Sequence, residues 1–236
     1  MYQAGRSLFL LTFNFIPVKK ALVLGASGFV GRYLVDLLLA NPSYEKVTIV
    51  VRRDIGLEDP KLKTLIADFE SLPKMKEAIE ADEVFITLGT TRKKTPDRKN
   101  YYQVDHDYPV LATRIARERG ASSVFLLTAV GADAGSGTFY LRTKGETERD
   151  VIGVGMDHTH IFRPSMILGE RTEFRLLERI VIKIWPLAEG LLKLSGLSKY
   201  RGISGKDIAK AMVNAASKQS GKVEIYEWKR MKELVG

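Results

Sequence analysis

Tyr140 and Lys144 are the residues of this sequence whose types and spacing point most directly to a reaction. Four positions apart on a helix, two side chains lie on one face. The ordinary pKa of a tyrosine is about 10, and a neighbouring ammonium lowers it because it favours the phenolate. Such a tyrosine can give a proton to a carbonyl oxygen as hydride arrives, or take one from an alcohol. Thr128, which ends the preceding predicted strand, is expected to hydrogen-bond the same oxygen.

Many helices contain a tyrosine and a lysine at this spacing by accident, so the surrounding elements decide what the pair means. Apolar strands are predicted at residues 21–24, 46–51, 63–67, 83–88, 124–127, 157–162 and from Val223, and helices at 72–81, 101–120, from Phe139, at 203–213 and at the end of the chain. Pro109 predicts a kink or a late start in the long helix, and Ser204 caps a later one. The alternation predicts an α/β fold with a doubly wound parallel sheet. Residues 170–200 are expected to form a small C-terminal helical cap over the substrate side.

A glycine motif follows the first predicted strand and opens a helix. Gly25, Gly28 and Gly31 recur at a spacing of three. Gly25 suits a tight turn, Gly28 lets the backbone approach a pyrophosphate, and Gly31 lets helix and strand pack closely. The helix N-terminus then offers N–H groups to phosphates. Strand, turn and helix together predict a dinucleotide site, and an ordinary turn that uses glycine for its geometry is the alternative.

The second predicted strand ends in Arg52 and Arg53, at the position that reads the adenosine ribose in this fold. An acid there pairs with the 2′-hydroxyl of NAD, whereas arginine accommodates the 2′-phosphate of NADP. The first acid, Asp54, comes only after both arginines. The pair therefore predicts NADP(H) as the preferred cofactor and leaves NAD(H) as the alternative. The alternative is that Arg52 and Arg53 are two solvated cations at the end of a strand and bind no ligand.

Two further strand ends supply candidate cofactor contacts. Asp68 can accept a hydrogen bond from the adenine amino group, and Phe69 can pack near the ring. Leu88, Gly89 and Thr90 follow the fourth strand, and ligands of such folds bind outside the carboxyl ends of the strands. A glycine there permits close approach of the cofactor, and a plain turn is the alternative.

The formal charge of +9 does not by itself indicate nucleic acid, because the basic residues are spread along the chain, often among acids. The densest basic run, residues 92–94 with Arg98 and Lys99, lies in a predicted loop. A solvated loop and an anionic cofactor or substrate both explain it better than DNA or RNA, since no nucleic-acid module occurs. We therefore expect a small-molecule substrate and no nucleic-acid partner.

Cysteine is absent, which excludes a disulfide framework, a thiol nucleophile and cysteine-ligated metal. His158 and His160 alternate on one predicted strand without a third ligand, so no metal site is expected. A chain without cysteine fits a cytoplasmic protein, and a homodimer is compatible with the sequence.

Residues 1–17 precede the predicted fold. Their apolar stretch, 8–16, is shorter than the ~20 residues that a membrane-spanning helix needs, so no stable membrane insertion is expected. Arg6 in front of it resembles the start of a signal peptide, but no small-x-small cleavage site follows. We expect an N-terminal extension that packs on the domain or on a partner, or a true start near Val18. Residues 18–236 are expected to form one NAD(P)-binding domain.

Taken together, these motifs resemble the short-chain dehydrogenase/reductase superfamily, in its atypical and extended branch, from about Lys20 to about Ala216. The branch includes proteins described as NAD-dependent epimerase/dehydratase-like. The resemblance rests on residues 25–31, 88–91, 140–144 and 162–165. Four segments are also similar to the HIV Tat-interactive-protein oxidoreductase-like group: Leu88-Gly-Thr-Thr-Arg92, Val104-Asp-His-Asp-Tyr108, Leu126-Leu-Thr-Ala-Val-Gly-Ala-Asp133 and Tyr140-Leu-Arg-Thr-Lys-Gly-Glu146.

The resemblance implies roles for individual residues. Tyr140 would be the general acid/base, and Lys144 would bind the nicotinamide ribose and tune Tyr140. The pyrophosphate would lie on the backbone of Ser27, Gly28, Phe29 and Val30, and the nicotinamide would border on Pro164 to Ile167. The implied function is an NADP(H)-dependent oxidoreductase that interconverts a carbonyl and an alcohol. A non-catalytic NADP(H) sensor and a nucleotide-sugar epimerase or dehydratase are the alternatives.

The sequence departs from the superfamily pattern at two positions. Related enzymes commonly end the fifth strand with two small hydroxyl residues, of which the second is often catalytic, whereas this chain has Thr128 and Ala129. If the family serine aligns with Ala129, Thr128 must replace it or the activity is reduced. Asp105 lies near the position where extended members often carry asparagine.

Overall fold

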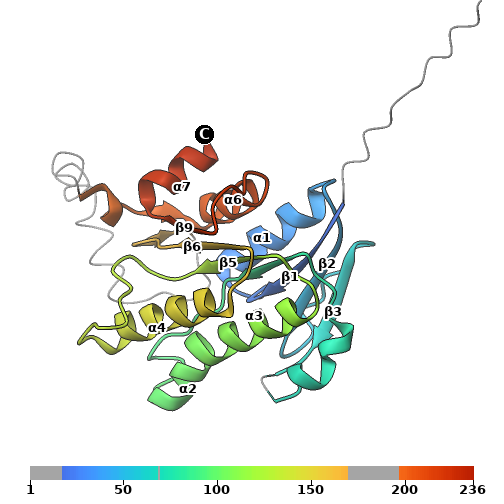
Figure 1. Ribbon diagram of the computed structural model, residues 1–236, viewed down its shortest axis with the longest axis horizontal. Helices are drawn as coiled ribbons and strands as arrows, with labels where there is room; N and C mark the ends of the chain where they lie inside the picture. The colour runs from blue at the N-terminus through green and yellow to red at the C-terminus, as the bar shows by residue number, and fades with distance from the viewer. Residues whose placement is uncertain (1–17, 69, 170–196) are drawn as a thin grey trace, which may run out of the picture.

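The core of the protein is one parallel sheet (Figure 1). The computed structural model describes residues 18–68, 70–169 and 197–236. The seven strands lie in the order β3-β2-β1-β4-β5-β6-β9, and every neighbouring pair is parallel. They are β1 (Lys19–Leu24), β2 (Tyr44–Val51), β3 (Leu62–Ile66), β4 (Glu83–Ile86), β5 (Ser123–Leu127), β6 (His158–Phe162) and β9 (Val223–Tyr226). The strand order reverses between β1 and β4, which is where ligands bind in doubly wound folds, and the predicted fold class is confirmed.

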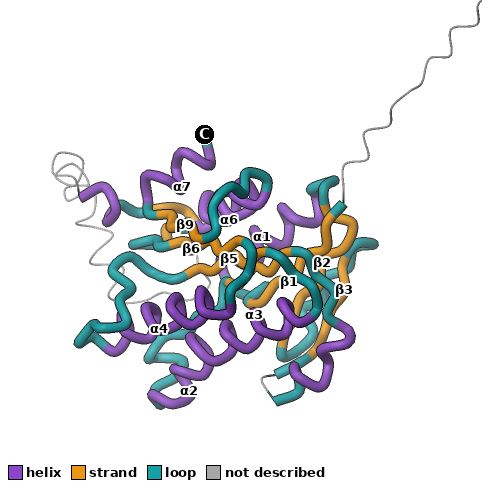
Figure 2. Tube along the Cα trace, viewed as in Figure 1, coloured by secondary structure: helices purple, strands orange, loops and turns teal. Residues whose placement is uncertain are grey.

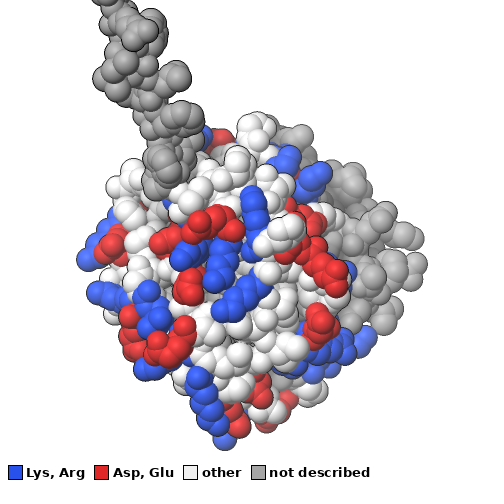
Figure 3. Space-filling view, turned by 90° about the vertical axis from the view of Figure 1, so that its right-hand side faces the viewer, with Lys and Arg blue, Asp and Glu red and all other residues white. Residues whose placement is uncertain are grey.

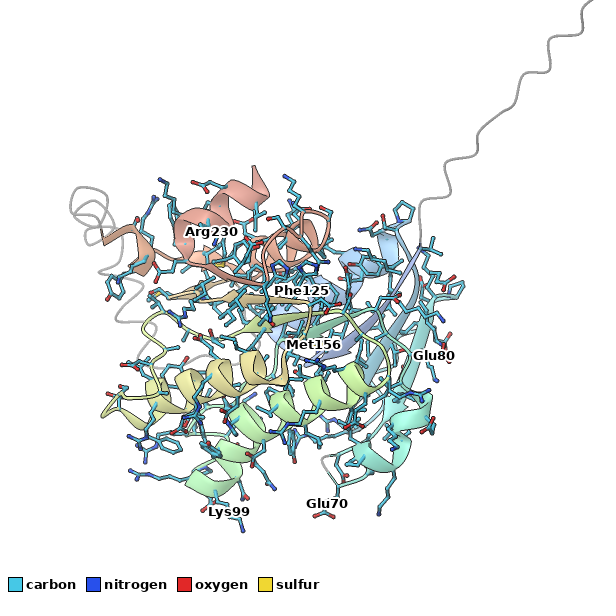
Figure 4. The ribbon with its side chains drawn as sticks, in the orientation of Figure 1. Glu70, Glu80, Lys99, Phe125, Met156 and Arg230 are labelled. Carbon is cyan, nitrogen blue, oxygen red and sulfur yellow. The ribbon has the colours of Figure 1, made fainter. Side chains whose placement is uncertain are left out.

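Helices cover both faces of the sheet (Figure 2). One face carries α1 (Phe29–Ala40), α6 (Gly205–Ala216) and α7 (Trp228–Val235), and the other carries the 3-10 helix η1 (Leu72–Ala78), α3 (Tyr108–Glu118) and α4 (Phe139–Val154). Two buried cores result, one on each face; Phe125 belongs to the first and Met156 to the second (Figure 4). Burying a side chain of this size contributes about 1.5–3 kcal/mol, so the two cores hold the strand ends in fixed positions.

The helical segment before β5 differs from a single long helix. It consists of α2 (Arg98–Tyr102), the π-helical turn η2 (Gln103–Asp107) and α3, which begins at Tyr108. Pro109 lies in the first turn of α3, where its missing N–H leaves no hydrogen bond unmade. Residues 98–118 are thus helical throughout, so the expected late start at Pro109 does not occur, and the irregularity near the proline is the π-helical turn η2. The helix predicted at residues 72–81 is instead the shorter η1, with a proline in its first turn.

The C-terminal helix α6 and strand β9 occur near their predicted positions. The side chain of Ser204 caps α6 and accepts a hydrogen bond from the backbone N–H of Asp207 at 2.9 Å. A short second ladder pairs β7 (Ile167–Leu168) with β8 (Ile203–Ser204). The 3-10 turn η3 (Leu197–Tyr200) directly precedes β8. Most of the predicted helical cap, and residues 1–17, lie outside the described residues.

Two surface properties bear on possible partners. On the face seen in Figure 3, basic and acidic side chains are interspersed. Among the described residues, no helix combines the length and the apolar character needed to cross a membrane.

Candidate functional site

The glycine turn between β1 and α1 leaves room only for glycine at two positions. Gly25 has a φ of +93°, a backbone conformation that L side chains rarely adopt. A Cβ at Gly31 would lie 2.0 Å from the carbonyl oxygen of Gly25 and 2.9 Å from Oγ1 of Thr87. The backbone N–H of Gly28 closes the turn by donating to the Gly25 carbonyl at 2.8 Å. The turn therefore packs against β4 as closely as the spacing of the glycines predicted.

The N-terminus of α1 fits a pyrophosphate. Gly28 is its N-cap, no side chain caps it, and no acidic residue occurs in its first turn. Its first N–H groups are therefore left to a ligand or to water. Ser27 is exposed beside them, whereas Val30 is buried in the core. The Phe29 ring packs between Gly169 and Gly205, so only its backbone can face a phosphate.

Three separate segments lie where the adenosine is predicted to bind. Arg52 and Arg53 follow β2 and are exposed, and within the described chain neither forms an ion pair with a carboxylate. Oδ1 of Asp68 accepts hydrogen bonds from the hydroxyl and the N–H of Ser71 at 2.6 and 2.9 Å, and these bonds lower the pKa of Asp68. Burial and the nearby Asp68 raise the pKa of Tyr108, and Arg52 opposes this rise. The charges of Arg52 and Asp68 therefore both act on the Tyr108 hydroxyl.

The sequence did not indicate that Tyr108 is influenced by Arg52 and Asp68, because both residues lie far from Tyr108 along the chain. Phe69, predicted to pack near the adenine, lies outside the described residues.

The other end of the crevice contains Tyr140 and Lys144 on α4. Tyr140 is 42% exposed, whereas Lys144 is only 6% exposed. The Lys144 ammonium lies 2.7 Å from Oδ1 of Asp105, and Oδ2 of Asp105 accepts a hydrogen bond from the backbone N–H of Thr90 at 2.8 Å. A Cβ at Gly89 would lie 3.8 Å from both charged groups, so the backbone of Gly89 runs close to the buried pair.

Burial by itself would lower the pKa of Lys144. The carboxylate of Asp105 and the negative charge that Tyr140 and Glu148 can carry outweigh this effect, and the net pKa is raised. Lys144 is therefore an ammonium throughout the physiological range, held by a carboxylate that lies 39 residues earlier in the sequence.

Thr128 has a different environment from the one that was expected. Its hydroxyl donates to Oε1 of Glu148 at 2.6 Å and lies 3.3 Å from the Phe162 carbonyl. Glu148 is buried and is also paired with Arg163, whose Nε donates to Oε1 at 3.0 Å. A bond from Thr128 to a substrate oxygen would require one of these contacts to break. Ala129 is buried and offers no hydroxyl.

The segment after β6 is fixed by backbone hydrogen bonds. The Pro164 carbonyl accepts from the N–H of Val130 at 2.9 Å, and Ile167 pairs with Ile203 in the β7–β8 ladder. Leu88, two residues after β4, packs against the second core. These contacts keep the residues predicted to border the nicotinamide at the carboxyl edge of the sheet.

A cavity of about 490 Å³ opens beside Tyr140. It is lined by Thr90, Thr91, Arg92, Arg98, Tyr101, Thr138, Phe139 and Tyr140. Sequence reasoning had placed Arg92 and Arg98 in a basic loop and had not singled out Tyr101, Thr138 or Phe139. The adjacency of Phe139 and Tyr140 at the start of a helix was the available signal. Among the described residues, no group of three or more His, Asp or Glu side chains could hold a metal ion.

Comparison with known proteins identifies relatives over most of the chain. A family model described as NAD(P)H-binding matches residues 25–219. Protein HTATIP2 of Rattus norvegicus is 33% identical over 221 residues, covering 92% of this chain and 89% of the relative. Protein FMP52, mitochondrial, of Candida albicans is 33% identical over 203 residues, covering 83% and 87%. The resemblance to the HIV Tat-interactive-protein group is thereby confirmed.

Solved structures support the fold. The Bordetella bronchiseptica enzyme WbmH in complex with NAD+ has a TM-score of 0.65 at 19% identity, covering 92% of this chain and 79% of that one. A UDP-glucose 4-epimerase from Thermotoga maritima, with UDP-glucose, has a TM-score of 0.66 at 16% identity, covering 91% and 81%. At these identities the likeness concerns the fold alone.

The relatives also correct one expectation. The absence of cysteine was taken to fit a cytoplasmic protein, but several curated relatives named FMP52 are named as mitochondrial. Cysteine content was a poor guide, because it reports the redox state of a compartment and does not distinguish one reducing compartment from another.

Proposed function

Because the chain belongs to the NAD(P)H-binding family, we propose that it is an NADP(H)-dependent oxidoreductase that interconverts a carbonyl and an alcohol on a small molecule. The observation that carries this proposal is the arrangement around Tyr140. An exposed phenol, a buried ammonium one helical turn away and a cavity beside the phenol occur together at the carboxyl edge of the sheet. A protein that only binds the cofactor has no need of this arrangement.

The residues that would hold the cofactor are distributed along that edge. The N–H groups that begin α1, around Ser27 to Val30, suit the pyrophosphate, and the arginines after β2 suit a 2′-phosphate. Lys144 and the backbone near Gly89 suit the nicotinamide ribose. When bound, the nicotinamide supplies or accepts the hydride.

Tyr140 is assigned the proton transfer. In reduction its hydroxyl donates a proton to the carbonyl oxygen, and in oxidation the phenolate removes the alcohol proton. Lys144 stabilises the phenolate because it remains an ammonium, and Asp105 holds that ammonium in place. The exposure of Tyr140 at the cavity lets a substrate oxygen reach the hydroxyl.

The direct test is a screen of aldehydes and ketones with NADPH, following loss of the reduced nicotinamide. We expect at least one carbonyl class to be reduced, and its alcohol to be oxidised when NADP+ is supplied. NADPH binding without turnover of any carbonyl or alcohol would instead favour the non-catalytic sensor.

A nucleotide-sugar epimerase is the second candidate, because solved structures of this fold include UDP-sugar epimerases. An epimerase returns the hydride to the same substrate, so it consumes no cofactor overall. Incubation with UDP-glucose and analysis of the sugar product distinguishes the two. With NADP+ or NAD+ present as the hydride acceptor, a changed sugar without net formation of reduced nicotinamide would replace the reductase proposal.

We propose in addition that the protein acts in mitochondria, as the names of its FMP52 relatives suggest. Fractionation of cells that express the full chain with a C-terminal tag tests this. Enrichment with a mitochondrial marker is expected, and recovery only with a cytosolic marker would contradict it.

A further inference from the structure

The cavity beside Tyr140 contains two guanidinium groups that proton and hydride transfer do not use. Arg92 and Arg98 both line it. Both are exposed, and in the described part of the chain neither forms an ion pair with a carboxylate. No acidic side chain lines the cavity among the described residues. Two cations without a counter-charge create a positive potential where the substrate must enter.

Arg92 lies on an ordered turn. The Thr91 carbonyl accepts hydrogen bonds from the N–H of Lys94 at 2.9 Å and of Thr95 at 2.8 Å. The hydroxyls of Thr90 and Thr95 lie 2.8 Å apart, and the N–H of Thr90 is bound to Asp105. The turn is therefore tied to the residue that also holds Lys144. The ordered backbone reduces the conformational entropy that the loop loses when Arg92 binds a ligand.

Arg98 is held against an aromatic wall. Its guanidinium carbon lies 5.4 Å from the centre of the Phe139 ring, within the range of a cation–π contact. Phe139 in turn makes an edge-to-face contact with Tyr101, with ring centroids 5.5 Å apart. The same cavity thus combines a fixed cation with an apolar surface next to Tyr140.

The donors in the cavity suit the oxygens of an anionic group. A guanidinium offers several N–H donors in a planar fork, which suits carboxylate and phosphate oxygens. The hydroxyls of Thr91 and Thr138 line the same cavity and can donate to such oxygens. The Phe139 and Tyr101 rings suit an apolar body attached to the anion.

We propose that this cavity selects carbonyl or alcohol substrates that carry a carboxylate or phosphate group on an apolar body. Arg92 and Arg98 hold the anionic group while the reacting oxygen lies at Tyr140. This inference rests on the proposed oxidoreductase function for its chemistry. The anion site itself is tested by binding and does not require turnover.

The binding test uses the full chain with NADP+ and three probes of one shape: benzoate, phenyl phosphate and benzyl alcohol. Calorimetric titration should show benzoate or phenyl phosphate binding at least about tenfold more tightly than the neutral alcohol, as expected for charge-assisted hydrogen bonds. The tighter of the two anions identifies the substrate group as a carboxylate or a phosphate. Equal affinity for all three probes would overturn the inference.

Charge-matched variants locate the site. Arg92→Gln and Arg98→Gln should each weaken anion binding about tenfold, whereas Lys93→Gln and Lys99→Gln should change it less than about twofold. Neither lysine lines the cavity, and Lys99 extends from α2 at the periphery (Figure 4). Equal losses in all four variants would indicate a general charge effect and contradict a built site. Weakened NADPH binding with unchanged benzoate binding would assign the arginines to the cofactor instead.

Turnover separates this inference from the proposed function. With NADPH, para-carboxybenzaldehyde should be reduced with a kcat/KM at least about tenfold above that of benzaldehyde, and Arg98→Gln should remove most of the difference. Arginine-dependent benzoate binding without reduction of any aldehyde would leave the anion site standing and refute the reductase. Reduction of both aldehydes at equal efficiency would support the reductase and refute the anion site.

Discussion

The ammonium nitrogen of Lys144 lies 2.7 Å from Oδ1 of Asp105, and both side chains are buried. The two residues come from α4 and from the π-helical turn η2. The pair joins the helix that carries Tyr140 to the loop after β4, because Asp105 also binds the backbone of Thr90. The position of Lys144 beside the crevice therefore depends on the buried carboxylate of Asp105.

Asp105→Asn should destabilise the protein by about 3 kcal/mol, because it leaves a buried ammonium without its counter-charge. Folding raises the pKa of Lys144 above 10.5. The contribution of the Asp105–Lys144 pair to the free energy of unfolding is therefore complete below that pH and is lost as the pH rises through the raised pKa. Urea unfolding near neutral pH measures the loss. Asp107→Asn, a more exposed carboxylate on the same turn, is the control and should cost less than about 1 kcal/mol.

The double variant Asp105→Asn/Lys144→Met sharpens this prediction. Removal of both charges should be less destabilising than the sum of the single changes. Additive losses would mean that the two groups do not interact in solution.

Arg52→Ala and Arg53→Ala should weaken NADPH binding by about tenfold or more in combination, because charge-assisted hydrogen bonds to the 2′-phosphate are lost. NADH affinity should change little. Titrations that follow nucleotide fluorescence provide the measurement, with Lys46→Ala, on the strand that precedes the two arginines, as the control. If the wild type binds NADH and NADPH with equal affinity, the arginines do not bind the 2′-phosphate.

Gly31→Ala should destabilise the protein by roughly 3 kcal/mol and abolish tight NADPH binding, since its Cβ would lie 2.0 Å from the Gly25 carbonyl oxygen. Gly137→Ala is the matched control, because nothing lies within 4 Å of a Cβ built there. It should change stability by less than about 0.5 kcal/mol. Thermal unfolding of both variants, with and without NADPH, separates the two effects. Unaltered stability in Gly31→Ala would contradict the close packing of α1 on the turn at Gly25.

The stability of the fold should fall with acid because of His160. Burial lowers its pKa from 6.5 to about 4, and its Nδ1 lies 2.9 Å from the Tyr226 hydroxyl. Below the unfolded pKa the unfolded chain takes up a proton that the folded chain refuses, so stability declines from pH 6.5 towards pH 4. The loss between about pH 7 and about pH 5 should be roughly 2 kcal/mol.

His160→Gln should flatten that part of the pH dependence, and His158→Gln on the same strand is the control. Urea unfolding at a series of pH values provides the comparison. An unchanged slope in His160→Gln would assign the acid sensitivity to other groups.

Much of the fold could be predicted from local patterns. Each of the seven strands of the main sheet overlaps a predicted strand, and Gly25 to Gly31 marked the first crossover. Local patterns did not predict which type of helix forms at two segments. The segment after Ser71 forms a short 3-10 helix, and the turn before Pro109 is π-helical, because in each case a proline constrains the backbone within a few residues.

The site was predictable only as far as its parts are close in the sequence. Tyr140 and Lys144 could be recognised from their spacing. The contact of Asp105 with Lys144 and that of Thr128 with Glu148 could not, because the sheet brings these residues together from separate segments. For the same reason the basic loop gave no indication that Arg92 and Arg98 share a cavity with Tyr140.

The most direct test of the proposed function is Tyr140→Phe, which removes one hydroxyl from an exposed side chain. Once a carbonyl substrate is found, kcat should fall by at least about a hundredfold, because general acid–base catalysis is lost. NADPH affinity and the urea midpoint should remain those of the wild type. A variant that turns over the substrate at the wild-type rate would remove Tyr140 from the mechanism and contradict the assignment.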